Sequence, residues 1–484
     1  MSAQVSVQPV PQAAAVRPAR RARPTLALAV IACCNAMIQL DDPIVNIALP
    51  GMRDGLGLSA VGAAWVINVY LLAFGGLLLL GGRAGDILGR RKVFLAGVGL
   101  FTAAAMLRGV APSGEFLVGV RAVQGVGAAL AAPSGLALVL SMFAEGAPRR
   151  RAIAVCTAVG AVSTAGGLLL AGALTSLSSW RWVLLLNVPL GLAILVLAPF
   201  VIEETARSLG RFDLAGALVS ALGAASLVYG LAQAAERSWS DPVVVGCVVA
   251  GAALLVVFVG IERHAEQPIV AMRLFTDRDR VCAYLGTLAV PGALIGTYFF
   301  LNQFFQQESG WGPLNAAAAL VPLPVTMAVT AVFAARLTEH IGAKQVMAIG
   351  AALLLSGNLW LTQLSATSGY WDAVLPALLM LGAGMACCVL PPTVLATSGL
   401  RPGEAGSAAG ALNSLQSVGG SLGLATLVTV STHSEGMSAA FLTGSAFAAA
   451  ALLAALCLRR PGADHTDRQA DGGGGRDRRA QELS

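Results

Sequence analysis

The stretch GGRAGDILGRRKVF, residues 81–94, separates two long apolar segments and decides how the rest of the sequence is interpreted. It contains one acid, Asp86, among several glycines, and three consecutive basic residues follow at 90–92. Glycines allow helix ends to approach one another closely, and clustered cations on a short loop are typical of the cytoplasmic side of a membrane protein. The pattern indicates a tight connection between two membrane helices.

The composition of the whole chain supports this interpretation. Hydrophobic residues make up 56% of the 484 residues and charged residues only 12%, whereas about 25% of a soluble domain is charged. The net charge of +6 comes from residues in short loops and tails, so no basic domain for nucleic acid exists. We therefore expect an all-α integral membrane protein surrounded by a lipid bilayer.

Fourteen apolar segments are long enough to cross a bilayer. If the N-terminus is cytoplasmic, 26 of the 31 Lys and Arg residues fall on the inner side, as the positive-inside rule predicts. Arg108 is counted with the outer loops, and Arg121 is the one basic residue placed inside a segment. The sequence thus predicts fourteen helices, both termini in the cytoplasm, and a multi-pass protein of the plasma (inner) membrane. The segments are approximately 25–49, 60–82, 93–111, 116–143, 152–176, 181–202, 213–234, 242–261, 281–305, 315–337, 345–366, 372–398, 406–431 and 437–458.

A weak internal repeat divides the chain. GDILGRRKVFLAG at 85–97 aligns without gaps with TEHIGAKQVMAIG at 338–350, and the GVG at 125–127 corresponds to the GAG at 382–384. The similar offsets of 253 and 257 residues predict two six-helix bundles that alternate access to a site near the membrane midplane. The expected domains are a disordered N-terminal tail at 1–24, bundles at 25–202 and 281–458, two inserted helices at 203–280, and a disordered C-terminal tail at 459–484.

Two adjacent acids, Asp41 and Asp42, lie inside the first apolar segment. A charged side chain at that depth is costly and usually functional, and burial beside a second carboxylate favours the protonated form of an acid. At 100° per residue, Asp42 shares a polar stripe about 60° wide with Asn35, Gln39 and Asn46, while Asp41 lies about 100° away from Asp42. Arg121 could favour proton release from either acid.

Other energy sources and catalytic sites lack their motifs. Neither G-x-x-x-x-G-K-[ST] nor H-E-x-x-H is present, and the four histidines fall in expected loops or a tail. No cysteine has zinc-ligand spacing with a histidine. We expect no enzyme activity, no metal and no cofactor, with a proton gradient as the energy source.

Several motifs resemble those of the major facilitator superfamily. GGRAGDILGRRKVF resembles its loop signature, LDDPIVNIALP at 40–50 resembles the first-helix signature of the fourteen-helix drug:proton antiporters, and RAVQGVGAA at 121–129 resembles their arginine motif. The resemblance implies the major facilitator fold and a monomer that exports hydrophobic or cationic small molecules in exchange for protons. Proton-driven uptake by a symporter of the same fold is the alternative.

The resemblance leaves the identity of the proton site open. Alignment on Asn46 and Pro50 makes Asp41 the family acid, whereas the helical stripe contains Asp42. Both remain candidates, with Arg121 as their partner. The sequence also departs from the family pattern: Gly167 occupies a usual proline position, and Pro43 replaces a threonine.

Two further groups of residues are expected to function. By analogy with the family, the loop motif acts as a conformational latch made of Gly82, Gly85, Asp86, Gly89, Arg90 and Arg91. Polar and aromatic residues on several segments are candidates for the substrate cavity. These are Asn35, Gln39, Asn46, Trp65, Tyr70, Gln124, Asn187, Tyr298, Asn302, Gln303, Gln306, Asn413 and Gln416.

Overall fold

The computed structural model describes residues 24–143, 147–204, 214–234, 237, 239–264, 277–365, 368–397, 405–433 and 436–458. Both expected tails lie outside the described residues, apart from Pro24, which begins the first helix. The described chain consists of helices and short connections. Each of the fourteen expected apolar segments coincides with a helix or with two consecutive helices.

The helices form two groups separated by a pair. The first group contains α1 (Pro24–Leu56), α2 (Ala60–Leu88), α3 (Arg90–Gly109), α4 (Gly114–Met142), α5 (Ala147–Leu177), α6 (Trp180–Leu185) and α7 (Asn187–Val201). The pair is α8 (Leu214–Gln233) and α9 (Pro242–His264). The second group contains α10 (Arg278–Gln303), the π-helix η2 (Phe304–Glu308), α11 (Pro313–Leu320), α12 (Pro322–Ile341), α13 (Ala343–Leu361), the π-helix η3 (Tyr370–Val374), α14 (Leu375–Thr397), α15 (Ala405–His433) and α16 (Met437–Leu456).

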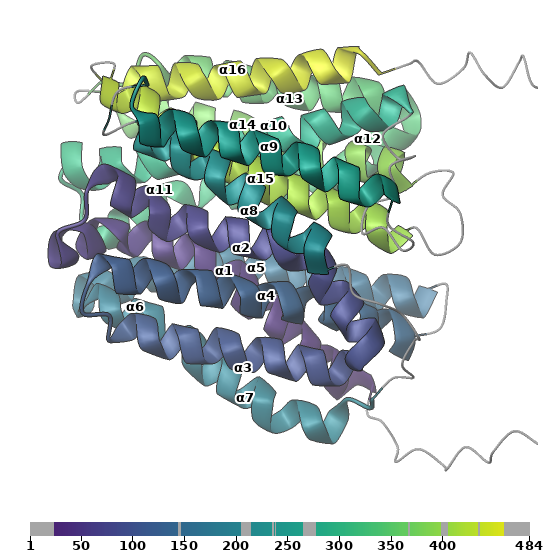
Figure 1. The fold of residues 1–484 in the computed structure, drawn as a ribbon. Helices are drawn as coiled ribbons and strands as arrows, with labels where there is room; N and C mark the ends of the chain where they lie inside the picture. The colour runs from purple at the N-terminus through teal and green to yellow at the C-terminus, as the bar shows by residue number, and fades with distance from the viewer. Residues whose placement is uncertain are drawn as a thin grey trace, which may run out of the picture.

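The two groups lie side by side, with their helices running in roughly the same direction (Figure 1). Within the first group α1 packs on α5, and α4 packs on both α2 and α3. Within the second, α10 packs on α15 and α16, and α14 packs on α12 and α13. Helix α8 packs on α9 and also on α2 and α15, so α8 connects the two groups.

The corresponding turns of the internal repeat share an unusual backbone conformation. Gly89, between α2 and α3, has φ +110°, and Gly342, between α12 and α13, has φ +86°. Only glycine adopts such angles without strain. Because these two glycines also align in the repeat with the offset of 253 residues, the turn geometry explains why both copies retain glycine there.

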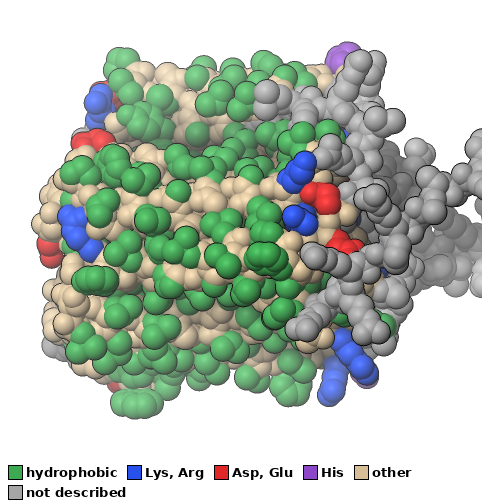
Figure 2. All heavy atoms as spheres, turned by 90° about the horizontal axis from the view of Figure 1, so that it is seen from below, with side chains coloured by type: hydrophobic (Ala, Val, Ile, Leu, Met, Phe, Trp, Pro, Cys, Tyr) green, Lys and Arg blue, Asp and Glu red, His purple; other side chains and the backbone are tan. Residues whose placement is uncertain are grey.

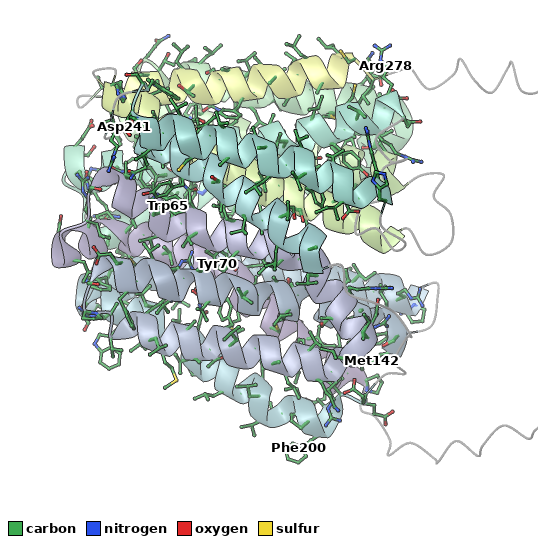
Figure 3. All side chains as sticks on the ribbon, in the orientation of Figure 1. Trp65, Tyr70, Met142, Phe200, Asp241 and Arg278 are labelled. Atoms are coloured by element: carbon green, nitrogen blue, oxygen red, sulfur yellow. The ribbon has the colours of Figure 1, made fainter. Side chains whose placement is uncertain are left out.

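Apolar side chains cover the sides of the molecule. Figure 2 shows hydrophobic side chains across the middle of one face, with charged side chains near its two ends. Asp241 and Arg278 lie at these opposite ends, and Phe200, 83% exposed, points outward from the side (Figure 3). Such a belt is expected for a chain whose sides contact lipid.

The number of candidate spans is lower than the sequence predicts. Among the described residues, twelve helical segments are long and apolar enough to cross a membrane, fewer than the fourteen expected. Helices α8 and α15 account for the difference. The described part of α8 forms a shorter apolar helix, Leu218–Gln233, and α15 is not among the twelve candidate spans.

Specific contacts join the two groups near one end of the molecule. On α10, Asn302 Nδ2 donates to the backbone carbonyl of Asn46 on α1 over 2.6 Å. In η2, Gln306 Nε2 donates to the carbonyl of Ile47 over 3.2 Å. Gly172 on α5 lies directly against α11, where a Cβ would meet Ala317. The groups therefore contact each other along the C-terminal halves of α1 and α5.

We predict that Gly423→Ala destabilises the second group. An added Cβ would collide with the backbone of Gly292 at the crossing of α15 and α10, and overpacking a core costs about 1–3 kcal/mol. Thermal unfolding in detergent should show a lower midpoint. Gly246→Ala on α9 is the matched control because its Cβ would meet nothing within 4 Å. Equal midpoints for both variants would contradict the packing described.

Candidate functional site

The candidate site is a cluster of charged side chains buried between α1, α3 and α4. Asp41, Arg108 and Arg121 are all 0% exposed. Arg108 Nη2 lies 2.8 Å from Asp41 Oδ1, and Arg121 Nη1 pairs with Asp41 Oδ2. Removing charges from water is expensive unless they are paired and hydrogen-bonded, so this arrangement holds the Asp41 carboxylate as an ion.

Two amides complete the surroundings of Asp41. Asn187 Nδ2 donates to Oδ1 over 2.7 Å, and Gln124 Nε2 donates to the same oxygen over 2.9 Å. Both amides were expected to line a substrate cavity. They are instead fully buried, and their hydrogen bonds connect α7 and α4 to α1.

Arg121 makes contacts on several sides. Its Nε donates to the carbonyl of Val66 over 2.8 Å, and its guanidinium lies 4.3 Å from the ring centroid of Tyr70, close enough for a cation–π interaction. Figure 3 labels Tyr70 on α2 near the seam between the two groups. Nη2 of Arg121 has no hydrogen-bond partner among the described residues. This nitrogen faces Asp42, whose Oδ1 lies 3.7 Å away.

Asp42 differs sharply from its neighbour. Its side chain is 50% exposed, whereas that of Asp41 is fully buried. Gln39, one turn earlier on α1, is also exposed. Two members of the helical stripe, Asp42 and Gln39, are therefore exposed, whereas Asn35 is partly buried and Asn46 is buried. Asp41 points into the first group of helices.

Arg108 is the residue that sequence reasoning missed. It was assigned to an outer loop, and that assignment is wrong because Arg108 lies in the last turn of α3 and is completely buried. Arg121 is therefore not the one basic residue within a span, because Arg108 also lies inside a helix. A signal was available, since position 108 falls inside the expected segment 93–111.

The other cavity candidates occupy several different places. Asn35 Nδ2 donates to the carbonyl of Cys156 on α5. Trp65 packs on Tyr229 of α8, with ring centroids 5.6 Å apart. The seven candidates that follow take no part in the charge cluster. Asn46, Asn302 and Gln306 lie at that contact, Gln303 lines a separate pocket, Tyr298 and Gln416 are partly buried, and Asn413 is exposed.

The expected latch residues do come together at the α2–α3 turn. Nε and Nη2 of Arg90 donate to Asp86 Oδ1 over 3.0 and 2.9 Å. Nη1 of Arg90 donates to the carbonyl of Ala137 on α4 over 3.2 Å. Gly82 and Gly85 approach α4 at Pro133 and Ser134, respectively. The motif therefore attaches the turn to α4.

A second attachment involves Glu204, which the sequence did not identify. Its Oε1 accepts from the backbone nitrogen of Arg91 over 3.1 Å, in the first turn of α3 where a negative charge is favoured. Arg91 Nη1 donates to the carbonyl of Ile202 over 3.1 Å. A Cβ at Gly89 would meet the Glu204 carboxylate. The turn is thus tied to the end of α7 as well as to α4.

We predict that Arg108→Gln destabilises the protein strongly. Removing one partner of a buried ion pair costs about 3–5 kcal/mol, because an unpaired charge remains. Adding Asp41→Asn should restore part of the lost stability, which a double-mutant cycle by thermal unfolding measures. Arg237→Gln is the control, since its ion pair with Asp241 is 45% and 27% exposed and should matter little. If Arg108→Gln lowers the unfolding temperature no more than Arg237→Gln does, the ion pair of Arg108 with Asp41 does not stabilise the protein as described.

Comparison with known proteins agrees with this architecture. The family model described as Major Facilitator Superfamily matches residues 31–424. The chain is 38% identical over 421 residues to the puromycin resistance protein pur8 of Streptomyces alboniger, covering 86% of this chain and 82% of that protein. It is 37% identical over 421 residues to the cephamycin export protein CmcT of Amycolatopsis lactamdurans, covering 86% of each chain.

Solved structures show the same fold. A crystal structure of the peptide transporter POT in complex with sulfate superposes with a TM-score of 0.68 at 14% identity, covering 89% of this chain and 93% of that one. The similarity extends over both groups of helices. The chain therefore belongs to the Major Facilitator Superfamily and is a multi-pass membrane transporter rather than an enzyme.

Proposed function

We propose that this chain exports hydrophobic or cationic small molecules, antibiotics among them, in exchange for protons. Relatives named for puromycin resistance and cephamycin export support the direction and the type of substrate. The observation that carries proton exchange is the pair of adjacent acids with unequal surroundings. One is enclosed by two arginines, and the other is half exposed beside an arginine nitrogen that has no hydrogen bond to any described residue.

In this proposal Asp42 exchanges the proton and Asp41 stays ionised. Asp41 accepts from two guanidinium groups and two amides, so protonating it would leave two buried arginines short of a counter-charge. Within the described part of the chain Asp42 has one ionic contact, at 3.7 Å, and can lose its charge without breaking a close hydrogen bond. Of the two alternatives that the sequence leaves open, this proposal takes Asp42, the acid of the helical stripe.

The charge balance explains how a proton and a cationic substrate exclude each other. With both acids ionised, two negative charges face the positive charges of Arg108 and Arg121. Protonating Asp42 leaves one positive charge in excess, which repels a cation in a poorly screened interior. A cation bound near Asp42 likewise favours loss of its proton. Because the proton and the cationic substrate compete for the Asp42 carboxylate, binding of one releases the other.

The proposed topology has fourteen membrane helices with both termini in the cytoplasm, in the plasma membrane, and the chain works as a monomer. Helix α8 has 20 residues and α15 has 29, and about 20 residues are enough to cross the hydrocarbon core. Both pack lengthwise against helices that are candidate spans. On this basis α8 and α15 cross the membrane beside α9 and α10.

We further propose that the structure represents a conformation open to the cytoplasm. The two groups are closed at the Asn46–Asn302 contact, beyond Asp42 along α1. Asp42 and Gln39 are exposed on the other side of that contact. Opening the contact would admit protons to Asp42 from outside, as alternating access requires.

We predict that Asp42→Asn abolishes proton exchange and weakens the binding of a cationic drug, because the neutral amide, like the protonated acid, leaves one positive charge in excess. Everted vesicles are tested with a panel of drugs that includes puromycin, a cephamycin and lincomycin. A transported drug should cause protons to leave vesicles that contain the wild type and not vesicles that contain Asp42→Asn. Asp42→Glu, which restores a carboxylate, should recover exchange. Full drug-dependent proton release from Asp42→Asn would disprove the assignment. Higher drug accumulation in cells with the transporter than without it would instead indicate uptake.

We predict that Glu204→Gln slows transport without weakening substrate binding. Loss of its charge weakens the attachment of the α2–α3 turn at the start of α3, an interaction of about 0.3–1 kcal/mol. Such a change should alter the transport rate up to about fivefold if the two conformations differ in this contact. Rates and binding constants for one exported drug measure the effect. Asp54→Asn, near the C-terminal end of α1 and outside the α2–α3 turn, serves as the control. Equal rates in both variants would show that Glu204 has no such role.

A further inference from the structure

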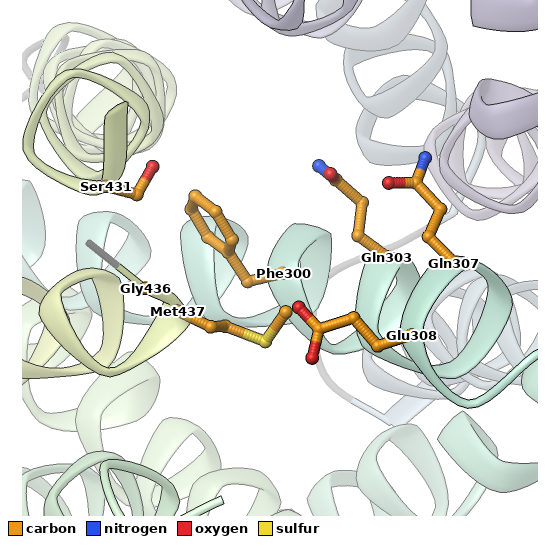
Figure 4. A pocket seen from close by; sticks show the side chains of 7 residues that line it. All are labelled: Phe300, Gln303, Gln307, Glu308, Ser431, Gly436 and Met437. Carbon is orange, nitrogen blue, oxygen red and sulfur yellow. The ribbon is translucent and has the colours of Figure 1, made fainter. Parts of the chain in front are cut away.

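A pocket separate from the charge cluster lies at the end of the second group of helices. It has a volume of about 220 Å³. Its lining comes from four helical elements: Phe300 and Gln303 on α10, Gln307 and Glu308 in η2, Ser431 on α15, and Met437 on α16 with Gly436 before it. Figure 4 shows these side chains arranged around an open centre. None of the lining residues takes part in the cluster around Asp41.

The lining favours an organic cation. Glu308 supplies a carboxylate, and the described lining residues include no Lys or Arg. Among the described residues no ion pair involves Glu308. The ring of Phe300 can attract a cation through its face, and the Met437 thioether offers a polarisable apolar contact. A volume of about 220 Å³ suits a small cation, since drug-sized ligands occupy pockets of about 300–1,000 Å³.

The backbone at the pocket has an uncommon form that positions its polar residues. Residues Phe304–Glu308 form a π-helix, a conformation that is rare and frequent at functional sites. An aromatic contact stabilises the π-helix: Phe305 stacks on Trp311, with ring centroids 5.0 Å apart. While Phe305 is buried, Gln307 and Glu308 are exposed. The π-helix therefore presents an amide and a carboxylate to the pocket on a fixed support.

The opposite face of the same π-helix takes part in the contact between the two groups. Gln306, which lies between the buried Phe305 and the exposed Gln307, donates to the carbonyl of Ile47 on α1 and to Asn302 Oδ1. A ligand held by Gln307 and Glu308 is thus one residue away from the contact that closes the groups together. Occupancy of the pocket and opening of this contact involve the same five-residue segment.

We propose that this pocket is a second binding site, accessible from outside the cell, for a small organic cation such as a quaternary ammonium. Glu308 balances the positive charge, while Phe300 and Met437 contact the apolar groups of the ligand. The inference uses the proposed membrane orientation but not the assignment of Asp42, because the two sites share no residue.

The test is protection of an introduced cysteine in the full chain in intact cells. Gln307→Cys places a thiol in the pocket, and a membrane-impermeant sulfonate methanethiosulfonate labels it from outside. The probe ligand is tetraethylammonium, and the concentration that halves the labelling rate is measured. Adding Glu308→Gln should raise that concentration about tenfold or more, since the loss of one charged contact at a partly shielded site has this magnitude.

Matched variants separate the possible outcomes. Glu115→Gln removes one negative charge from the start of α4, on the same side of the membrane but outside the pocket, and should leave protection unchanged. The parent chain without Gln307→Cys measures labelling of the native cysteines. Absence of protection, or protection that persists with Glu308→Gln, overturns the site. Labelling of Gln307→Cys that occurs only in permeabilised cells would show that the pocket is not accessible from outside. The proton exchange measured with Asp42→Asn tests the charge cluster and not this pocket.

Discussion

The ion pairs of Asp41 constrain the whole first group of helices. One carboxylate receives donors from α3, α4 and α7, so four helices share a single buried charge. In an interior of low dielectric constant, such a network is stable only while every member keeps its partner. This constraint explains why α3 carries an arginine in its last turn despite the cost of burial. It also leaves Asp42 as the acid that can change its charge without disturbing the packing.

The second group repeats the geometry without the charges. Asp41 lies five residues before Asn46, and Thr297 lies five residues before Asn302, the two asparagines that meet between the groups. Thr297 Oγ1 donates to Asn358 Oδ1 on α13 over 2.6 Å, and α13 corresponds to α3 in the internal repeat. A neutral hydrogen bond therefore replaces the buried ion pair. In the proposed mechanism, proton exchange belongs to the first group and the second group moves against it.

The sequence predicts the helices far better than the site. Apolar length and loop charge place the helices, because the bilayer imposes both, and the glycines of the α2–α3 turn indicate its special backbone. Partners from distant helices leave no such local pattern. Gln124 and Asn187 look like cavity amides in sequence, and only the packing of α4 and α7 shows that they point at Asp41. Arg108 was missed because a single charge near a segment end is equally typical of a loop.

The central claim is that Asp42 takes up and releases the proton while Asp41 remains a carboxylate. Infrared difference spectroscopy of the purified transporter during a pH titration tests this directly, because a protonated carboxylic acid and a carboxylate absorb at different frequencies. The account predicts a carboxylic acid band in the wild type that is lost in Asp42→Asn and restored in Asp42→Glu. A band that persists unchanged in Asp42→Asn would contradict the account. It would show that another acid takes up the proton, and Asp41 would be the first candidate.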